Sequence, residues 1–217
     1  MSVISAAQAN HLNSLVRKKI DSRLFLTCNY SPTEVPALGS SAKFYLGIQD
    51  LYKFAVDTSC VIGSLKKYLP VDTEQSFIRG FQTQLDHIKT LRSVIDHSQS
   101  SYDGFFAREH LRCYDSIIQA ALEKPKNKDE TAAKVKLRPE TESDFELLYA
   151  SLKNRADRLL EDLESFIELV AASGEREEIT KRWIAATIEW YSKKQDIYLG
   201  QLGDVYQAKM ADAQKSS

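Results

Sequence analysis

The chain has few residues that break regular structure, and it has no long hydrophobic run. Its 217 residues include eight Gly and five Pro, which disfavours an all-β or loop-rich fold. No stretch of about 18 apolar residues occurs, so we expect no membrane-spanning helix and no membrane partner. The first ten residues lack a basic segment followed by an apolar one, so a signal peptide is not expected.

Cysteine and net charge are equally unremarkable. Cys28, Cys60 and Cys113 lie far apart, and no Cys/His cluster has the spacing of a zinc site. We therefore expect free thiols, a cytoplasmic location, no metal and no cofactor. The formal charge is −1 and the pI is about 6.4, so the totals show no strongly basic surface for nucleic acid. A local basic patch is compatible with these totals.

Apolar periodicity predicts an all-α fold with about six helices. Their expected ranges are Ser5–Leu26, Ser41–Leu69, Asp72 or Thr73 to His97, Phe105–Leu122, Ser143 to about Ser173, and Glu175–Ala208. We expect Asp72 or Thr73 to be an N-cap. The charged stretch 123–142 contains two prolines and predicts an exposed loop. The whole pattern predicts one domain, 1–217, folded as an antiparallel helical bundle.

The third predicted helix carries an Arg-x4-His pair, Arg92 and His97, at its C-terminal end. Arg92 falls on the apolar face, where a guanidinium needs a carboxylate, a phosphate or access to water. On a straight helix His97 lies about 140° around and roughly 7.5 Å along from Arg92. The two side chains therefore converge only if the helix ends at His97 or if a second copy faces the first. The polar residues 98–104 favour an end.

Such a pair is suited to cleavage of a phosphodiester. Histidine transfers protons near neutral pH, and the bidentate guanidinium stabilises the added negative charge of the transition state. In RNA the neighbouring 2′-hydroxyl can be the nucleophile, so a metal ion is not required. The alternatives are a structural salt bridge for Arg92 and a helix-capping role for His97.

The segment Leu91-Arg92-Ser93-Val94-Ile95-Asp96-His97-Ser98 resembles the R-x4–6-H signature of the HEPN superfamily of helical-bundle proteins. The resemblance covers about eight residues and the all-helical setting. It implies a metal-independent RNase of a toxin–antitoxin or defence system, in which two motifs form one site in a dimer. Arg92 and His97 would be the catalytic pair. Ser93 stands where the family often has Asn, and the family also includes members that have lost catalysis.

Two further groups of residues have both a structural and a functional interpretation. Lys89 and Arg79 are candidates for contacts with an RNA backbone, and the alternative is a solvated helix surface. Trp183, Trp190 and Tyr191 lie on the sixth predicted helix. They are expected either to pack in the core or to form an interface with a second copy or a partner.

These observations predict a metal-independent endoribonuclease of a bacterial toxin or antiphage defence system. His97 would be the general acid or base, Arg92 would stabilise the transition state, and Ser93 or Asp96 would orient the pair. RNA, a second copy of the chain and a cognate antitoxin are the expected partners. The alternative is a non-catalytic helical module that binds a protein partner, such as an immunity, antitoxin or regulatory subunit.

Overall fold

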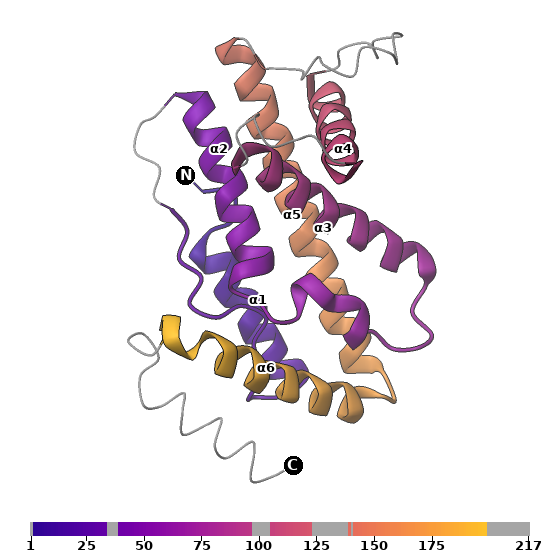
Figure 1. The fold of residues 1–217 in the computed structure, drawn as a ribbon. Helices are drawn as coiled ribbons and strands as arrows, with labels where there is room; N and C mark the ends of the chain where they lie inside the picture. The colour runs from indigo at the N-terminus through magenta and orange to yellow at the C-terminus, as the bar shows by residue number, and fades with distance from the viewer. Residues whose placement is uncertain (1, 34–38, 97–104, 123–138, 140, 199–217) are drawn as a thin grey trace. The chain divides into compact units, whose positions relative to one another are not determined.

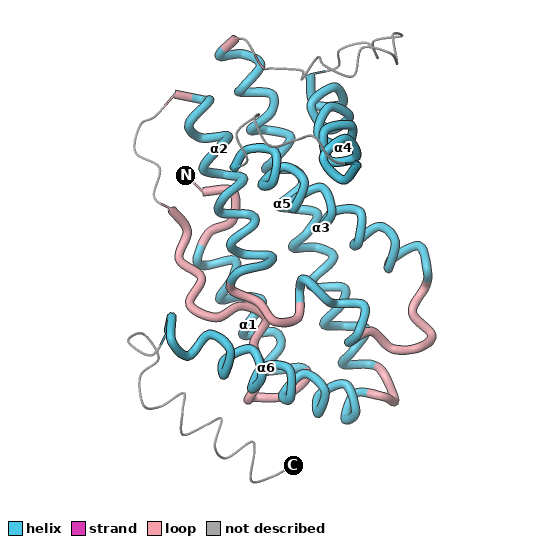
Figure 2. The backbone as a smooth tube through the Cα atoms, in the orientation of Figure 1, coloured by secondary structure: helices cyan, strands magenta, loops and turns pink. Residues whose placement is uncertain are grey.

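The computed structural model describes residues 2–33, 39–96, 105–122, 139 and 141–198. Figures 1 and 2 show these residues as helices and connecting loops, with no strand among them. The helices are α1 (Ala6–Lys19), α2 (Ser40–Tyr52), α3 (Gln75–Asp96), α4 (Phe105–Leu122), α5 (Glu142–Ala172) and α6 (Arg176–Tyr198). The predicted all-α class is therefore confirmed. Within this described part, no helix is both long enough and apolar enough to cross a bilayer.

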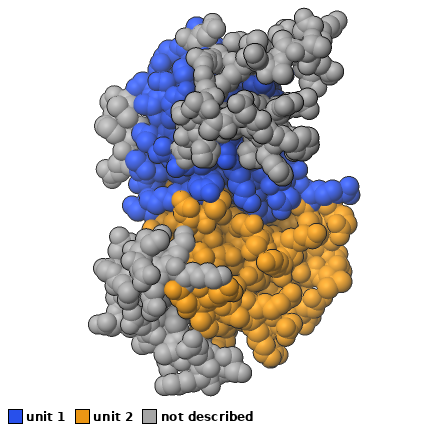
Figure 3. Space-filling model, viewed as in Figure 1, with its two compact units in different colours: residues 1–5, 31–54, 79–159 blue, residues 6–30, 55–78, 160–217 orange. Residues whose placement is uncertain are grey.

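The chain divides into two compact units, which Figure 3 colours separately. Unit 1 comprises residues 1–5, 31–54 and 79–159, and unit 2 comprises residues 6–30, 55–78 and 160–217. Helices α2 and α4 belong to unit 1, α1 and α6 belong to unit 2, and α3 and α5 contribute residues to both. The single domain expected over 1–217 stays a prediction.

The core of unit 1 forms where α2 and α5 come close together. Phe44 and Phe145 contact each other with their ring centroids 6.2 Å apart. At Gly47, an added Cβ would lie 2.8 Å from a methyl carbon of Leu152 and 3.0 Å from one of Val3, so a side chain there would force these neighbours to shift. The apolar faces of both helices are buried, as their spacing predicts.

The core of unit 2 is built around Trp183 of α6, whose side chain is fully buried. The indole ring lies 5.7 Å from the ring of Phe166 on α5 and 6.1 Å from that of Tyr68, measured between centroids. Aromatic contacts of this kind add to the free energy gained by burying the rings. Aromatic packing therefore contributes to holding α6 against α5 in this unit.

The first helix is shorter than predicted. It ends at Lys19, although the apolar spacing continues to Leu26. The side-chain oxygen of Asn13 accepts hydrogen bonds from the backbone N–H groups of Leu26 and Thr27, at 2.8 and 3.1 Å. Leu24 and Leu26 are still buried, but a turn rather than a helix delivers them to the core. A side chain thirteen residues upstream satisfies the backbone that a longer helix would have paired internally.

The second helix was predicted to be continuous from Ser41 to Leu69, and this is wrong. Helix α2 ends at Tyr52, a π-helical turn covers Lys53–Asp57, and a 3-10 helix covers Ile62–Tyr68. The hydroxyl oxygen of Ser59 accepts hydrogen bonds from the N–H groups of Val61 and Ile62, at 3.2 and 3.0 Å. Serine offers the backbone this alternative to helical pairing, so the chain breaks here.

The remaining boundaries are close to their predictions. Helix α3 begins at Gln75, and the bond from Ile78 N–H to the Glu74 carbonyl shows that neither Asp72 nor Thr73 is the N-cap. Helix α4 has the predicted bounds, and α5 begins one residue before Ser143. Of the predicted loop 123–142, residues 123–138 and 140 lie outside the described part, as do residues 199–208 of the sixth predicted helix.

Candidate functional site

Arg92 occupies the last turns of α3, on its inner side. The guanidinium carbon lies 5.8 Å from the centroid of the Tyr52 ring, at the end of α2. The side chain is half-buried, and its Nη1 atom is shielded from solvent. Attraction between the cation and the electron-rich ring face offsets part of the cost of removing the charge from water. The predicted position of Arg92 on the apolar face is thereby confirmed.

The structure does not report on the second member of the predicted pair. His97 lies outside the described residues, as does the side chain of Asp96, the last residue of α3. Ser93, which follows Arg92 in the sequence, is half-buried. Lys89 is half-buried and Arg79 is exposed, both on α3. The structure thus places Arg92 at a helix end, while its distance from His97 stays untested.

A different arginine–histidine pair is present in unit 1. Nη1 of Arg155, on α5, lies 2.8 Å from Nδ1 of His87, on α3 (helices in Figure 1). The guanidinium can only donate, so Nδ1 of His87 is the acceptor and the neutral ring carries its proton on Nε2. Both side chains are half-buried and therefore retain contact with solvent.

The pKa values of both members of the pair are lowered. Burial lowers the pKa of His87, the Arg155 guanidinium lowers it further, and Asp86 opposes both effects. Burial also lowers the pKa of Arg155, with a further contribution from Arg158 that Cys113 opposes. Among the described residues, no ion pair joins Arg155 to a carboxylate.

The sequence gives only a faint signal for this pair, because 68 positions separate its two members. Arg155 follows Leu152 by three residues and precedes Ala156, so it borders the apolar seam of α5. His87 lies between the buried Leu85 and Ile88 of α3. A charged residue at the border of each apolar face was the available clue. Nothing in the sequence says that the two borders meet.

The aromatic residues of α6 lie mainly within unit 2. Trp183 is fully buried, which favours core packing over an interface. The Tyr191 hydroxyl is hydrogen-bonded to the Cys28 thiol, and the Tyr191 ring meets that of Phe25 edge-on at 6.0 Å. Trp190 is half-buried, with its ring 5.2 Å from that of Tyr191. Trp190 and Tyr191 are both half-buried, so each keeps some surface exposed.

The cysteines are free, as expected. Burial raises the pKa of Cys28, although its hydrogen bond with Tyr191 works in the opposite direction. Burial likewise raises the pKa of Cys60, whose sulfur lies 3.4 Å from the Thr187 hydroxyl. Both thiols therefore stay protonated and are poor nucleophiles. The described part of the chain contains no group of three or more His, Cys, Asp or Glu residues that could hold a metal ion.

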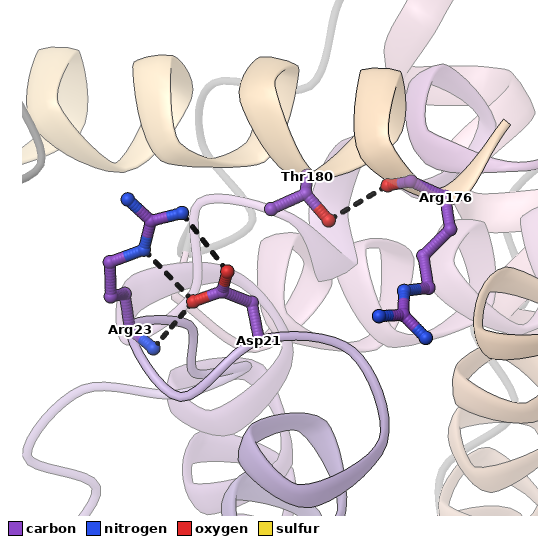
Figure 4. Close-up of polar contacts among 4 residues, drawn as sticks. All are labelled: Asp21, Arg23, Arg176 and Thr180. Carbon is purple, nitrogen blue, oxygen red and sulfur yellow. Dashed lines mark hydrogen bonds and ion pairs between the residues drawn. The ribbon is translucent and has the colours of Figure 1, made fainter. Parts of the chain in front are cut away.

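A polar cluster in unit 2 follows α1 and is drawn in Figure 4. The Asp21 carboxylate accepts hydrogen bonds from the Arg23 guanidinium and from the Arg23 backbone N–H. In α6, the Thr180 hydroxyl donates to the carbonyl of Arg176 at 2.8 Å, and the Arg176 charge also acts on Asp21. The Asp21 charge is compensated by Arg23, so we assign this ion pair a structural role.

Comparisons with protein-family models, with curated protein sequences and with solved structures find no match to this chain. Any statement about function therefore depends on the residues themselves. The two features with unusual chemistry are Arg92 at the end of α3 and the contact between Arg155 and His87.

Proposed function

We propose that the chain is a metal-independent endoribonuclease whose HEPN-like site lies at the end of α3. Arg92 stabilises the phosphodiester transition state, and His97 acts as general acid or base. One observation carries the proposal: a half-buried guanidinium is held against the Tyr52 ring, and its helix extends to Asp96, the residue before His97. A cation retained on an inner face without being fully buried is suited to an anionic substrate.

In this proposal the Arg92 guanidinium binds the phosphate, and the Tyr52 ring holds the cation in position. A ring face accepts the positive charge but does not use the planar fork of N–H donors, which matches two phosphate oxygens. Ser93 and Asp96 flank the arginine and the histidine in the sequence, and in this proposal they orient the pair. The 2′-hydroxyl of the RNA is the nucleophile, and the product carries a 2′,3′-cyclic phosphate.

The cations of α3 give the RNA backbone a path to this site. Lys89 precedes Arg92 by three residues, so the two are neighbours on the helix surface. Arg79 lies about 20 Å further from Arg92 along the helix axis. Arg79 also points about 140° away from Arg92 around the helix, so an RNA strand that contacts all three winds partway around α3. Lys89 supports the phosphate next to the cleaved bond, and Arg79 contacts a more distant one.

The wider setting is part of the same proposal. The chain acts in the cytoplasm as a homodimer with a HEPN-like helical arrangement, in a bacterial toxin or antiphage defence system with a cognate antitoxin. Dimerisation brings two copies of the Arg92–His97 motif together, which a single straight helix cannot do for one pair. A non-catalytic module that binds a protein partner is the second candidate, and the half-exposed Trp190 of α6 favours it.

The decisive experiment is RNA cleavage in the presence of EDTA. Purified full-length protein is incubated with a mixed RNA pool, and the product ends are identified as 2′,3′-cyclic phosphate or otherwise. Arg92→Ala and His97→Ala are each expected to reduce the rate at least 100-fold, because general acid–base catalysis alone contributes about 10²–10⁴-fold.

Two control variants separate this effect from nonspecific loss of charge. Arg17→Ala removes an exposed arginine of α1, and His11→Ala removes an exposed histidine of the same helix. Both are expected to cleave RNA at the wild-type rate. Cleavage that persists in both Arg92→Ala and His97→Ala would refute the site. Absence of cleavage by the wild-type dimer would favour the binding module.

A further inference from the structure

We propose that Arg155 and His87 form a second site, separate from Arg92, that binds a phosphate monoester group or free phosphate. The site lies in unit 1, where α5 supplies the guanidinium and α3 supplies the imidazole. Five residues separate His87 from Arg92 on α3, so the two side chains point about 140° apart around the helix. The second site therefore does not depend on the proposed ribonuclease activity.

The first argument is the unusual partner of Arg155. A half-buried guanidinium normally contacts a carboxylate, because removing its charge from water costs free energy. Here its hydrogen-bond partner is the Nδ1 atom of a neutral imidazole, 2.8 Å away. This contact uses one of five N–H donors and adds no negative charge. An oxyanion is the kind of ligand that would complete the site.

The second argument is the charge of the surrounding residues. Arg158, on the next turn of α5, adds positive charge near Arg155, while Cys113 of α4 is the neighbour that would oppose it if ionised. Among the described residues, Asp86 of α3 is the acidic group that acts on His87, and it is exposed. Both members of the pair remain half-buried, so a small anion can reach them from solvent.

The chemistry of the pair selects among oxyanions. The planar guanidinium fork binds two oxygens of a phosphate or a carboxylate. Burial and Arg155 lower the pKa of His87 in the absence of a ligand, and the negative charge of a bound phosphate acts in the opposite direction. Protonation at Nδ1 ends the hydrogen bond from Arg155, and a phosphate monoester loses its second proton with a pKa of about 6. A phosphate dianion can therefore bind both the guanidinium and a protonated imidazole, whereas a monoanion needs the guanidinium alone. A carboxylate is fully ionised at that pH, so its charge does not change over the range in which the histidine titrates.

The test is a pH titration of the histidine ring protons by NMR, using the full-length chain. It is run in sodium chloride and in sodium phosphate at equal ionic strength, and His87→Gln identifies the His87 signal. Phosphate is expected to raise the pKa of His87 by about one unit, which corresponds to tenfold tighter binding to the protonated ring. The exposed His11 of unit 2 serves as an internal reference and is expected not to respond.

Further arms identify the source of the phosphate and the role of the arginine. AMP should reproduce the pKa shift of His87 if the site accepts a phosphate monoester. A shift with phosphate but not with AMP restricts the site to the free ion. Adenosine and acetate should cause no shift. Arg155→Gln should abolish the response, and Arg158→Gln should retain it. An equal shift of His11 and His87, or no shift of His87 in the wild type, would overturn the proposal. The wild-type comparison decides even if Arg155→Gln fails to fold.

Discussion

The Asp21 carboxylate takes three hydrogen bonds from a single neighbour. The backbone N–H, Nε and Nη2 of Arg23 donate to it at 2.8, 3.0 and 3.0 Å. The hydrogen bonds from the Arg23 side chain are the largest cause of the lowered pKa of Asp21; burial opposes them, and the positive charge of Arg176 assists. The pair lies at the surface, with 40% of the Arg23 side chain and 22% of the Asp21 side chain exposed, so its contribution to stability is modest.

Asp21→Asn is expected to lower the free energy of unfolding by about 0.5–1 kcal/mol at neutral pH. Because the folded-state pKa is below the unfolded value, this stabilisation is present above the unfolded pKa of about 3.9 and is lost as the pH falls through the folded pKa. Urea denaturation followed by circular dichroism, at neutral pH and in acid, measures both conditions. Asp72→Asn, an exposed residue of the same unit, is the control. An Asp21→Asn deficit of equal size in acid would contradict the assignment.

Single residues also show which features of the candidate sites could be predicted from the sequence. Arg92 was placed on the inner face of α3 from spacing alone, and the structure agrees. The Tyr52 ring beneath it could not be foreseen, because it follows from the way α2 packs. The contact between His87 and Arg155 was missed for the same reason. Chemistry within one helix can be derived from spacing, whereas chemistry between helices needs their packing.

At the scale of elements, two of the predicted helices agree closely with the structure. The bounds of α4 are those expected, and α5 differs by one residue at its start. The second predicted helix failed because the π turn over Lys53–Asp57 and the Ser59 hydrogen bonds interrupt a pattern that stays apolar. The bond from the Cys28 N–H to the Thr58 carbonyl, at 2.7 Å, holds the break from a distant segment. The spacing of apolar residues along the sequence does not reveal such tertiary contacts.

Two helical glycines give opposite predictions for the same substitution. Gly47→Ala in α2 is expected to destabilise unit 1 by about 1–2 kcal/mol, because overpacking against Leu152 and Val3 exceeds the gain in helix propensity. Gly80→Ala in α3 is expected to stabilise by about 0.5–1 kcal/mol, since nothing lies within 4 Å of the added Cβ. Denaturant midpoints of the two variants measure both effects. Equal shifts of the same sign would contradict the packing at Gly47.

At the scale of the whole molecule, the formal charge of −1 constrains the proposed binding of RNA. No broad basic field is available to attract nucleic acid, so binding depends on a few local contacts. The proposed function supplies three of them, from Arg79, Lys89 and Arg92. Under the proposed function, we therefore expect weak RNA binding, with substrate selection at the site of cleavage.

The dependence of RNA affinity on salt tests this limit. With three phosphate contacts to a single strand, log K is expected to fall with log salt concentration with a slope of about −2. The measurement uses the His97→Ala variant to prevent cleavage, and fluorescence anisotropy of a labelled RNA reports binding. Adding Lys89→Ala should reduce the slope by about 0.7, one contact's share. A slope several times steeper would show a larger basic surface than α3 provides.

Both tryptophans of the chain, Trp183 and Trp190, belong to unit 2. Tryptophan fluorescence therefore comes from unit 2 alone. In the folded protein the Trp183 ring is fully buried beside Phe166. Comparing intrinsic emission with a probe of total helix content therefore reveals whether the two units melt together. Coincident curves indicate one cooperative transition, while separated curves assign the emission change to unit 2.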